Sequence, residues 1–221
     1  MRTPRSMTFG SYHTHADGLW TLTGWKFSDA TYKQTLVEIP GSSVLLDLST
    51  SLTGGEPTYS SRTLTATFES SEGDRLARKA RIEKMINTLD GYRMNIILPD
   101  DPDRYITGRL SVKELYNDMA HASVQVTAVC EPWKYAKAET VVSLQAETDE
   151  QEATLVNSGR LGLVPTLVVT DGDVRVTYGT NSWALSPGTY ALPDFYLTPG
   201  EHAFTYEGEG ALTITYREAV L

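Results

Sequence analysis

Two histidines and an aspartate near the start of the chain are the first residues whose types and spacing suggest chemistry. They form the pattern His13-x-His15-x-Asp17. In a β-strand, alternate side chains point to one face, so two imidazoles and a carboxylate would face a common metal ion. No further ligand follows at a supporting spacing. Solvated histidines are therefore the favoured interpretation, and we expect no metal site.

The acidic segment Asp100-Asp101-Pro102-Asp103 resembles a fragment of a calcium loop. An EF-hand needs a central glycine and a glutamate at its twelfth position, and this segment has neither. Aspartate followed by proline is also ordinary β-turn chemistry. The segment is therefore predicted to be the turn of a hairpin.

No nucleophile motif accompanies these acids. The serine-containing turns at 41–43 and 157–159 do not match the Gly-x-Ser-x-Gly elbow of hydrolases, and no phosphate loop or dinucleotide fingerprint exists. Cys130 lies on the apolar face of an alternating segment and is predicted to be a small core residue. The two carboxylates of a glycosidase need not be close in sequence, so such a pair stays an open alternative. No acidic residue of this sequence is singled out as a member of one. We expect neither catalysis nor a cofactor.

Composition describes a soluble globular protein. The chain has 221 residues, of which 40% are hydrophobic and 21% are charged. No run of about 18 apolar residues exists, so no membrane span is expected. The first residues lack the apolar region of a secretory signal, and the single cysteine excludes an internal disulfide. Synthesis in a reducing cytoplasm is expected.

The net charge of −9 is unevenly distributed. Residues 136–221 contain 4 Lys and Arg against 12 Asp and Glu, a net charge of −8, which leaves −1 for residues 1–135. Neither stretch has the clustered basic residues of a nucleic-acid binder. The contrast predicts two domains, 1–135 and 136–221.

Alternation of apolar and polar residues dominates the first domain and predicts strands. In 63–68, three apolar residues alternate with threonines, and the segment 122–130 repeats the pattern with Cys130 at its end. Further strands are predicted around 20–27 and 35–39. The segments 94–98 and 105–112 are predicted to form a hairpin.

One helix is predicted between these strands, over residues 74–90. Asp74 or Ser71 can cap its start, and Gly91 follows its end. An apolar stripe occupies its last two turns, at Ile82, Met85, Ile86 and Leu89. The same face holds Arg75 and Arg78 in the first turn, where positive charge opposes the helix macrodipole.

Two interpretations of this charged face stay open. The helix can simply overhang the edge of its sheet, which charge patterns of this kind favour. Alternatively, Arg75 and Arg78 meet carboxylates of a neighbouring subunit, and Arg78→Glu then weakens oligomerisation. The candidate interface residues on this reading are Tyr59, Arg62, Arg75, Arg78, Lys79 and Arg81.

Turn residues punctuate 136–221 at intervals of mostly 8–12 residues, the spacing of a β-sandwich or barrel. Aromatic residues are frequent there. Trp183, Tyr190 and Tyr196 are candidates for a weak saccharide surface. The favoured alternative is that these rings fill the core and rim of a small sandwich.

The order of several short motifs resembles the distal tail proteins, often called Dit, of long-tailed, siphovirus-type phages. The resemblance covers residues 6–221. In the first half it rests on Phe9-Gly10, Asp17-Gly18-Leu19, Pro40-Gly41, Leu46-Asp47, Gly54, Tyr59-x-x-Arg62, the strand 64–68, the helix, the 100–105 hairpin and Cys130-Glu131-Pro132-Trp133. In the second half it rests on Asn157-Ser158-Gly159, Pro165-Thr166-Leu167, Leu197-Thr198-Pro199-Gly200 and the strand 213–217. Gly41-Ser42-Ser43 departs from the family, where an arginine-containing turn is common.

The resemblance implies a mainly β chain, with an N-terminal split β-barrel, one flanking α-helix and a C-terminal galectin-like β-sandwich. It also implies a hexameric ring in the virion, at the tail tip, that joins the tail tube protein to the tail-tip hub protein. The C-terminal domains then project outwards to hold receptor-binding proteins or a host saccharide. No catalysis and no cofactor are implied.

Three hypotheses follow from the sequence. The first is a structural protein of a phage tail tip, in which the segment 40–62 reaches the next subunit as an arm. The second is a carbohydrate-binding adhesin that uses the C-terminal sandwich on a host surface. The third, and least favoured, is a glycan-acting enzyme.

Overall fold

The computed structural model of the chain describes residues 5–53 and 55–221. Gly54, one of the residues on which the resemblance rests, lies outside the described residues. The chain divides into two units, Met1–Lys134 and Tyr135–Leu221. Strands dominate both, which confirms the predicted mainly β class.

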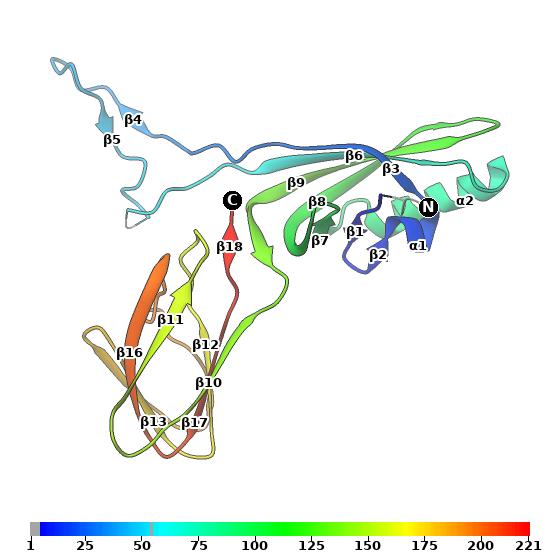
Figure 1. Cartoon of the computed structure of the whole chain (residues 1–221). Coiled ribbons are helices and arrows are strands. Elements are labelled where there is room, and N and C mark those ends of the chain that lie inside the picture. The colour runs from blue at the N-terminus through cyan, green and yellow to red at the C-terminus, as the bar shows by residue number, and fades with distance from the viewer. Residues whose placement is uncertain (1–4, 54) are drawn as a thin grey trace. The chain divides into compact units, whose positions relative to one another are not determined.

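A curled antiparallel sheet forms the body of the first unit (Figure 1). In chain order the described elements of this unit are β1 (Thr8–Phe9), β2 (Tyr12–His13), α1 (Thr14–Gly18), β3 (Thr21–Phe27), β4 (Leu36–Val37), β5 (Leu46–Asp47), β6 (Arg62–Ser70), α2 (Arg75–Leu89), β7 (Arg93–Leu98), β8 (Asp101–Asn117) and β9 (Ala122–Ala136). The sheet follows the spatial order β2-β1-β7-β8-β9-β6-β3, and β4 pairs only with β5.

The alternation read from the sequence decides which face of the sheet is buried. On β6 the side chains of Leu64, Ala66 and Phe68 are buried, while the threonines between them face outwards. Opposite them on β9, Val124 pairs with Phe68 and Ala128 pairs with Leu64. Burying a large apolar side chain stabilises a fold by about 1.5–3 kcal/mol, so this double row fixes the register of the two strands.

The helix α2 covers this buried face. Its N-cap is Asp74, whose Oδ1 accepts a hydrogen bond from the Ala77 amide at 2.8 Å. Gly91 follows its end with φ +78°, a left-handed conformation that glycine adopts without strain. The predicted apolar stripe is confirmed, because Ile82, Met85 and Leu89 belong to the core with the strands.

Cys130 lies at the end of the buried row on β9 and is almost inaccessible to solvent, as predicted. Its neighbour across the sheet is Gly108: a Cβ at that position would lie 2.6 Å from the Cys130 sulfur. Burial raises the pKa of the Cys130 thiol to about 11, and the nearby Arg62 only partly opposes this shift. The residue is therefore a packing residue with very little thiolate at neutral pH.

The raised pKa of Cys130 predicts slow labelling by thiol reagents in the native protein. The thiolate is the reactive form, so at pH 8 a pKa near 11 leaves roughly a hundredfold less of it than in the unfolded chain. We expect native labelling by a maleimide to be slower by at least about that factor, and mass spectrometry with and without denaturant measures it. Equal rates in the two states would show that Cys130 is accessible.

The histidine segment does not form the single strand that a metal site would need. His13 ends β2, and His15 and Asp17 lie in α1. The His13 Nδ1 accepts a hydrogen bond from the Ala16 amide at 3.0 Å, and the Asp17 carboxylate accepts one from the His13 amide at 2.6 Å. These contacts cap a short helix, because a side-chain acceptor before the first turn satisfies its free amides. In residues 5–53 and 55–221 no group of three His, Cys, Asp or Glu could hold a metal ion.

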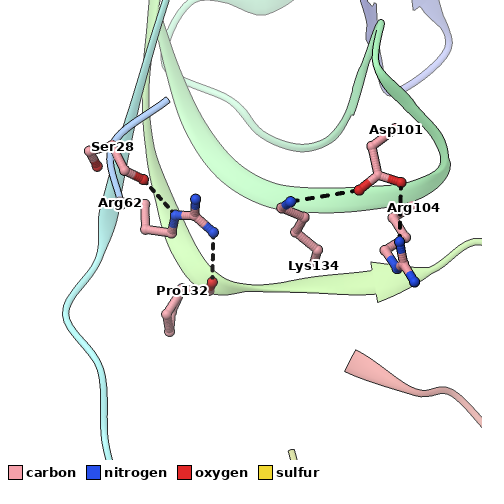
Figure 2. Close-up of polar contacts among 6 residues, drawn as sticks. All are labelled: Ser28, Arg62, Asp101, Arg104, Pro132 and Lys134. Atoms are coloured by element: carbon pink, nitrogen blue, oxygen red, sulfur yellow. Dashed lines mark hydrogen bonds and ion pairs between the residues drawn. The ribbon is translucent and has the colours of Figure 1, made fainter. Parts of the chain in front are cut away.

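The hairpin after α2 exists, but its turn is shorter and earlier than predicted. Leu98 pairs with Asp101, so the turn is Pro99-Asp100, and Asp101 already begins β8. The Asp101 carboxylate lies 3.5 Å from the Arg104 guanidinium and 3.7 Å from the Lys134 ammonium (Figure 2). This acid therefore forms one ion pair within β8, with Arg104, and one across to β9, with Lys134.

Two four-stranded antiparallel sheets form the second unit, in the orders β10-β17-β12-β15 and β11-β16-β13-β14. The strands of these sheets are β10 (Thr140–Gln145), β11 (Gln151–Asn157), β12 (Thr166–Thr170), β13 (Val174–Tyr178), β14 (Asn181–Leu185), β15 (Gly188–Ala191), β16 (Gly200–Gly208) and β17 (Ala211–Tyr216). The last strand, β18 (Ala219–Val220), belongs to neither sheet. Both sheets contribute buried side chains to one core, for example Ile214 on β17 and Phe204 on β16. No helix is found among the described residues of this unit.

The sequence predicted an apolar strand at 35–39, and the structure makes it part of an exposed hairpin. Only Leu36 and Val37 form β4, and they pair with Asp47 and Leu46 of β5. None of the four is buried. Figure 1 shows this hairpin extending away from the curled sheet. The segment 40–62, considered above as an arm, therefore begins in an extended, exposed hairpin.

Candidate subunit interface

An exposed apolar arm is the most unusual surface feature of the first unit. We define the arm as residues 34–57, which include β4 and β5. Its Leu52 side chain is 99% exposed and Val44 is 71% exposed. The other large exposed apolar residues of the arm are Leu36, Val37, Ile39, Leu45, Leu46 and Leu48. Single exposed apolar residues are common in soluble proteins, but a contiguous set of this kind indicates an interaction surface.

The base of the arm is a short antiparallel ladder. Tyr32 forms a β-bridge with Tyr59, and the Lys33 amide donates to the Thr58 carbonyl at 2.9 Å. The Tyr59 ring also packs edge-on against the rings of Tyr32 and Trp133, at centroid distances of 6.0 and 5.5 Å. Aromatic pairs of this geometry stabilise by about 0.5–1.5 kcal/mol each. They attach the arm to the end of β9.

Arg62 lies directly behind this base and is only 7% exposed. Its Nε donates to the Ser28 carbonyl at 2.7 Å, and its Nη1 lies 3.5 Å from the Pro132 carbonyl (Figure 2). The guanidinium carbon sits 3.8 Å from the centre of the Phe27 ring, a cation–π contact. Burial lowers the pKa of this guanidinium. Arg62 therefore joins the two chain segments that lead into and out of the arm.

The Arg78 side chain is also buried within the first unit, where it is 1% exposed. Its Nη1 donates to the Gly73 carbonyl at 2.5 Å. Its Nη2 donates to the carbonyls of Asp118 and Met119 at 2.9 and 3.1 Å. The guanidinium thus ties the first turn of α2 to the loop between β8 and β9.

The other candidate interface residues lie on the outer side of the helix. Arg75 and Lys79 are exposed, and the Lys79 ammonium lies 3.6 Å from the Glu83 carboxylate one turn on. Arg81 is half-buried and donates to the Glu72 carbonyl and, at 3.5 Å, to the Ser70 hydroxyl. Exposed pairs of this type contribute about 0–1 kcal/mol, so the charges of Arg75 and Lys79 remain largely available to a partner.

Sequence reasoning missed the two apolar residues that lie beside these charges. Leu76, in the first turn of α2, is 79% exposed, and Met119, in the β8–β9 loop, is 87% exposed. Leu76 lies outside the apolar stripe of the helix, and Met119 lies in a loop between Asp118 and Ala120. Neither position has a periodic signal.

The three aromatic candidates for a saccharide surface lie on separate elements of the second unit. Trp183 on β14 packs edge-on against Phe195, with ring centroids 6.2 Å apart. Tyr190 on β15 donates its hydroxyl to the Ser186 carbonyl at 2.8 Å. The Tyr196 ring lies over Gly162, where an added Cβ would be 2.1 Å from the tyrosine hydroxyl. Each ring is at least half-buried within its unit.

A separate cleft of about 390 Å³ lies in the second unit, and none of these three aromatic residues lines it. Its polar lining includes Asp173, Ser186, Glu207 and Arg175, and the last two form an ion pair at 3.6 Å. Hydroxyls and carboxylates bind sugar hydroxyls by hydrogen bonding, but the stacking ring that often accompanies them is not part of this lining.

Comparisons with known proteins find the fold but no sequence relative. No family model and no curated protein matches the chain. Among solved structures, the chain is similar to the crystal structure of SPP1 Dit (gp 19.1), described as a paradigm of the hub adsorption apparatus in Gram-positive infecting phages. The TM-score is 0.68 at 14% sequence identity, over 97% of this chain and 99% of that one.

The likeness covers both units and shows that the chain has a Dit-like fold. No helix among the described residues has the length and apolar character needed to cross a membrane.

Proposed function

We propose that this chain is a structural protein of the tail tip of a long-tailed phage. Six copies form a ring that joins the tail tube protein to the tail-tip hub protein and to the host-adsorption apparatus. The observation that supports this most is the likeness to a hub adsorption protein over nearly the whole of both chains. The protein belongs to the virion and is made in the cytoplasm of the host cell.

In this proposal residues 1–135 build the ring and its central channel. A cyclic ring needs two different, complementary surfaces on each subunit. The exposed arm and the exposed basic residues Arg75 and Lys79 supply such surfaces, with Arg81 at their edge. Tyr59, Arg62 and Arg78 act from within the subunit, because they hold the arm base and the β8–β9 loop in place.

Residues 136–221 form the periphery of the ring, a galectin-like sandwich that holds a receptor-binding protein or meets a host saccharide. Their net charge of −8 keeps neighbouring copies apart in solution. A saccharide would contact the partly exposed edges of Trp183, Tyr190 and Tyr196. We infer a binding role without catalysis, cofactor, or specific binding of nucleic acid.

Negative-stain imaging of the purified protein tests the ring. We expect class averages with six-fold symmetry, a central channel and outward-projecting densities. A homogeneous monomer that binds sugars would instead support the adhesin hypothesis. Glycan-array binding on the same sample measures that outcome, and a monomer without sugar binding would contradict both roles.

A further inference from the structure

The arm and the start of α2 lie at opposite ends of the same strand. The chain leaves the arm and enters β6 at Arg62, and it leaves β6 at Ser70 shortly before α2. Nine strand residues span roughly 30 Å. Figure 1 shows the arm at one end of the curled sheet, with α2 and the β8–β9 hairpin at the other. A subunit with complementary surfaces at opposite ends associates head to tail.

The surface at the α2 end is a fixed corner, which we define by Arg75, Leu76, Lys79 and Met119. The Asn117 amide donates to the Arg75 carbonyl at 3.2 Å, and Arg78 donates to the two carbonyls that follow Asn117. These bonds hold the loop that carries Met119 against the first turn of the helix. The exposed side chains of Leu76 and Met119 therefore belong to one fixed corner.

The β8–β9 loop at this corner is itself pre-organised. The Asp118 carboxylate accepts hydrogen bonds from the amides of Ala120 and His121, at 2.8 and 2.7 Å. These bonds lower the pKa of Asp118. A loop fixed in this way loses little conformational entropy when a partner binds it.

The charges of the two ends are opposite. The arm contains Glu38, Asp47 and Glu56 and no lysine or arginine. The helix α2 has five basic residues and one acidic residue, Glu83. Two of the basic residues, Arg75 and Arg78, lie in its first turn, where the macrodipole disfavours positive charge. The buried hydrogen bonds of Arg78 offset this cost, whereas the Arg75 side chain is exposed and its charge is open to a partner.

We propose that the arm of one subunit binds the α2 corner of the next copy of this chain. The apolar arm side chains cover Leu76 and Met119, and the acidic arm residues face Arg75 and Lys79. This contact rests on the ring of the proposed function and identifies which two surfaces close it. It also gives a reason for the exposure of the most accessible apolar side chains of the first unit, Leu52, Met119, Leu76 and Val44.

Cross-linking between engineered cysteines tests the pairing directly. The full chain carrying Leu52→Cys and Met119→Cys is treated with a short bismaleimide, while the buried Cys130 stays unmodified. The matched control is the chain that carries Leu52→Cys and Asp103→Cys. Asp103 is an exposed residue near the β7–β8 turn. We expect a ladder of two to six linked chains with the Met119 variant and at least tenfold less with the control.

The mass of the sample without cross-linker shows whether six chains assemble. It therefore distinguishes a wrong assignment of the two contacting surfaces from the absence of a ring. A six-chain assembly without Met119 cross-links, or with equal linkage to Asp103, would overturn the pairing and leave the ring intact. Linkage within single chains would overturn it too, since the arm would then fold onto its own corner. A sample that stays monomeric and unlinked would contradict both the pairing and the ring.

Charge exchange gives a second readout that needs no cross-linker. Reversing the arm (Glu38→Lys, Asp47→Lys, Glu56→Lys) or the corner (Arg75→Glu, Lys79→Glu) should each weaken association by about tenfold, the scale of a few exposed charge pairs. Both sets in one chain should restore much of the loss. Additive weakening without recovery would show that the two surfaces do not meet.

Discussion

Arg78→Glu will destabilise the first unit itself, in addition to any effect on assembly. The substitution removes a guanidinium that donates to three backbone carbonyls and places a carboxylate among those same acceptors. Removing one member of such a buried polar network costs about 3–5 kcal/mol. Domains are stable by only about 5–15 kcal/mol, so we expect the substitution to remove a large share of the stability of this unit and to lower the yield of folded protein.

Arg78→Met gives the graded version of this result. It keeps the apolar stem and loses the hydrogen bonds, so we expect a loss of about 3 kcal/mol, or roughly 10 °C in the midpoint of thermal unfolding. Arg75→Glu is the matched control on the same helix, because its side chain is exposed. It should shift the midpoint by less than about 2 °C. Circular dichroism measures both midpoints. Equal shifts of the midpoint for Arg75→Glu and Arg78→Met would contradict the assigned role of Arg78.

A chain without the arm will remain folded and lose its ability to assemble. Residues 34–57 can be replaced by Asn-Gly, because Lys33 and Thr58 are already paired across the ladder and a two-residue turn suits that geometry. Burying even three large apolar arm side chains in an interface is worth about 5 kcal/mol, nearly four orders of magnitude in Kd. We expect a monomer at concentrations where the full chain forms rings.

Thermal unfolding of the armless chain is the control for this prediction. The deleted residues contribute no member of the buried core, so the midpoint should stay within a few degrees of the full chain. An armless protein that still forms six-membered assemblies would show that the arm is dispensable. A large fall in the midpoint would show instead that the arm stabilises its own subunit.

The regular elements could be predicted because their periodicity and their capping residues agree. Leu64, Ala66 and Phe68 alternate along β6, and Asp74 and Gly91 bracket a helix with its own apolar stripe. In these segments, local preference and burial require the same conformation. The short helix α1 escaped prediction because its cap is a histidine nitrogen, a rarer acceptor than serine or aspartate.

The candidate interface could be predicted only in part. Arg62 and Arg78 were candidates for contacts with a neighbouring subunit, and both side chains lie inside their own unit. Most of their acceptors are backbone carbonyls at least 34 residues away in sequence, of Ser28 for Arg62 and of Asp118 and Met119 for Arg78. The tertiary fold decides which backbone carbonyls lack a donor, and the sequence does not show them. An arginine that binds such carbonyls is therefore predicted to be a surface charge.

The exposure of the arm was hidden for a related reason. An apolar segment such as 35–39 normally predicts a buried strand, since burial is the usual source of its stability. Whether a sheet of the same chain accepts that strand depends on tertiary pairing. Here, among the described strands, β4 pairs with β5 alone, and the apolar side chains of the hairpin stay exposed.

The mass of the purified protein in solution tests the central claim most directly. Six chains of 24.4 kDa give a ring of about 146 kDa. We expect native mass spectrometry and light scattering of the full chain to show that species, in equilibrium with free subunits on dilution. A monomer at every concentration, or a closed two-fold dimer in which identical surfaces meet, would contradict the ring.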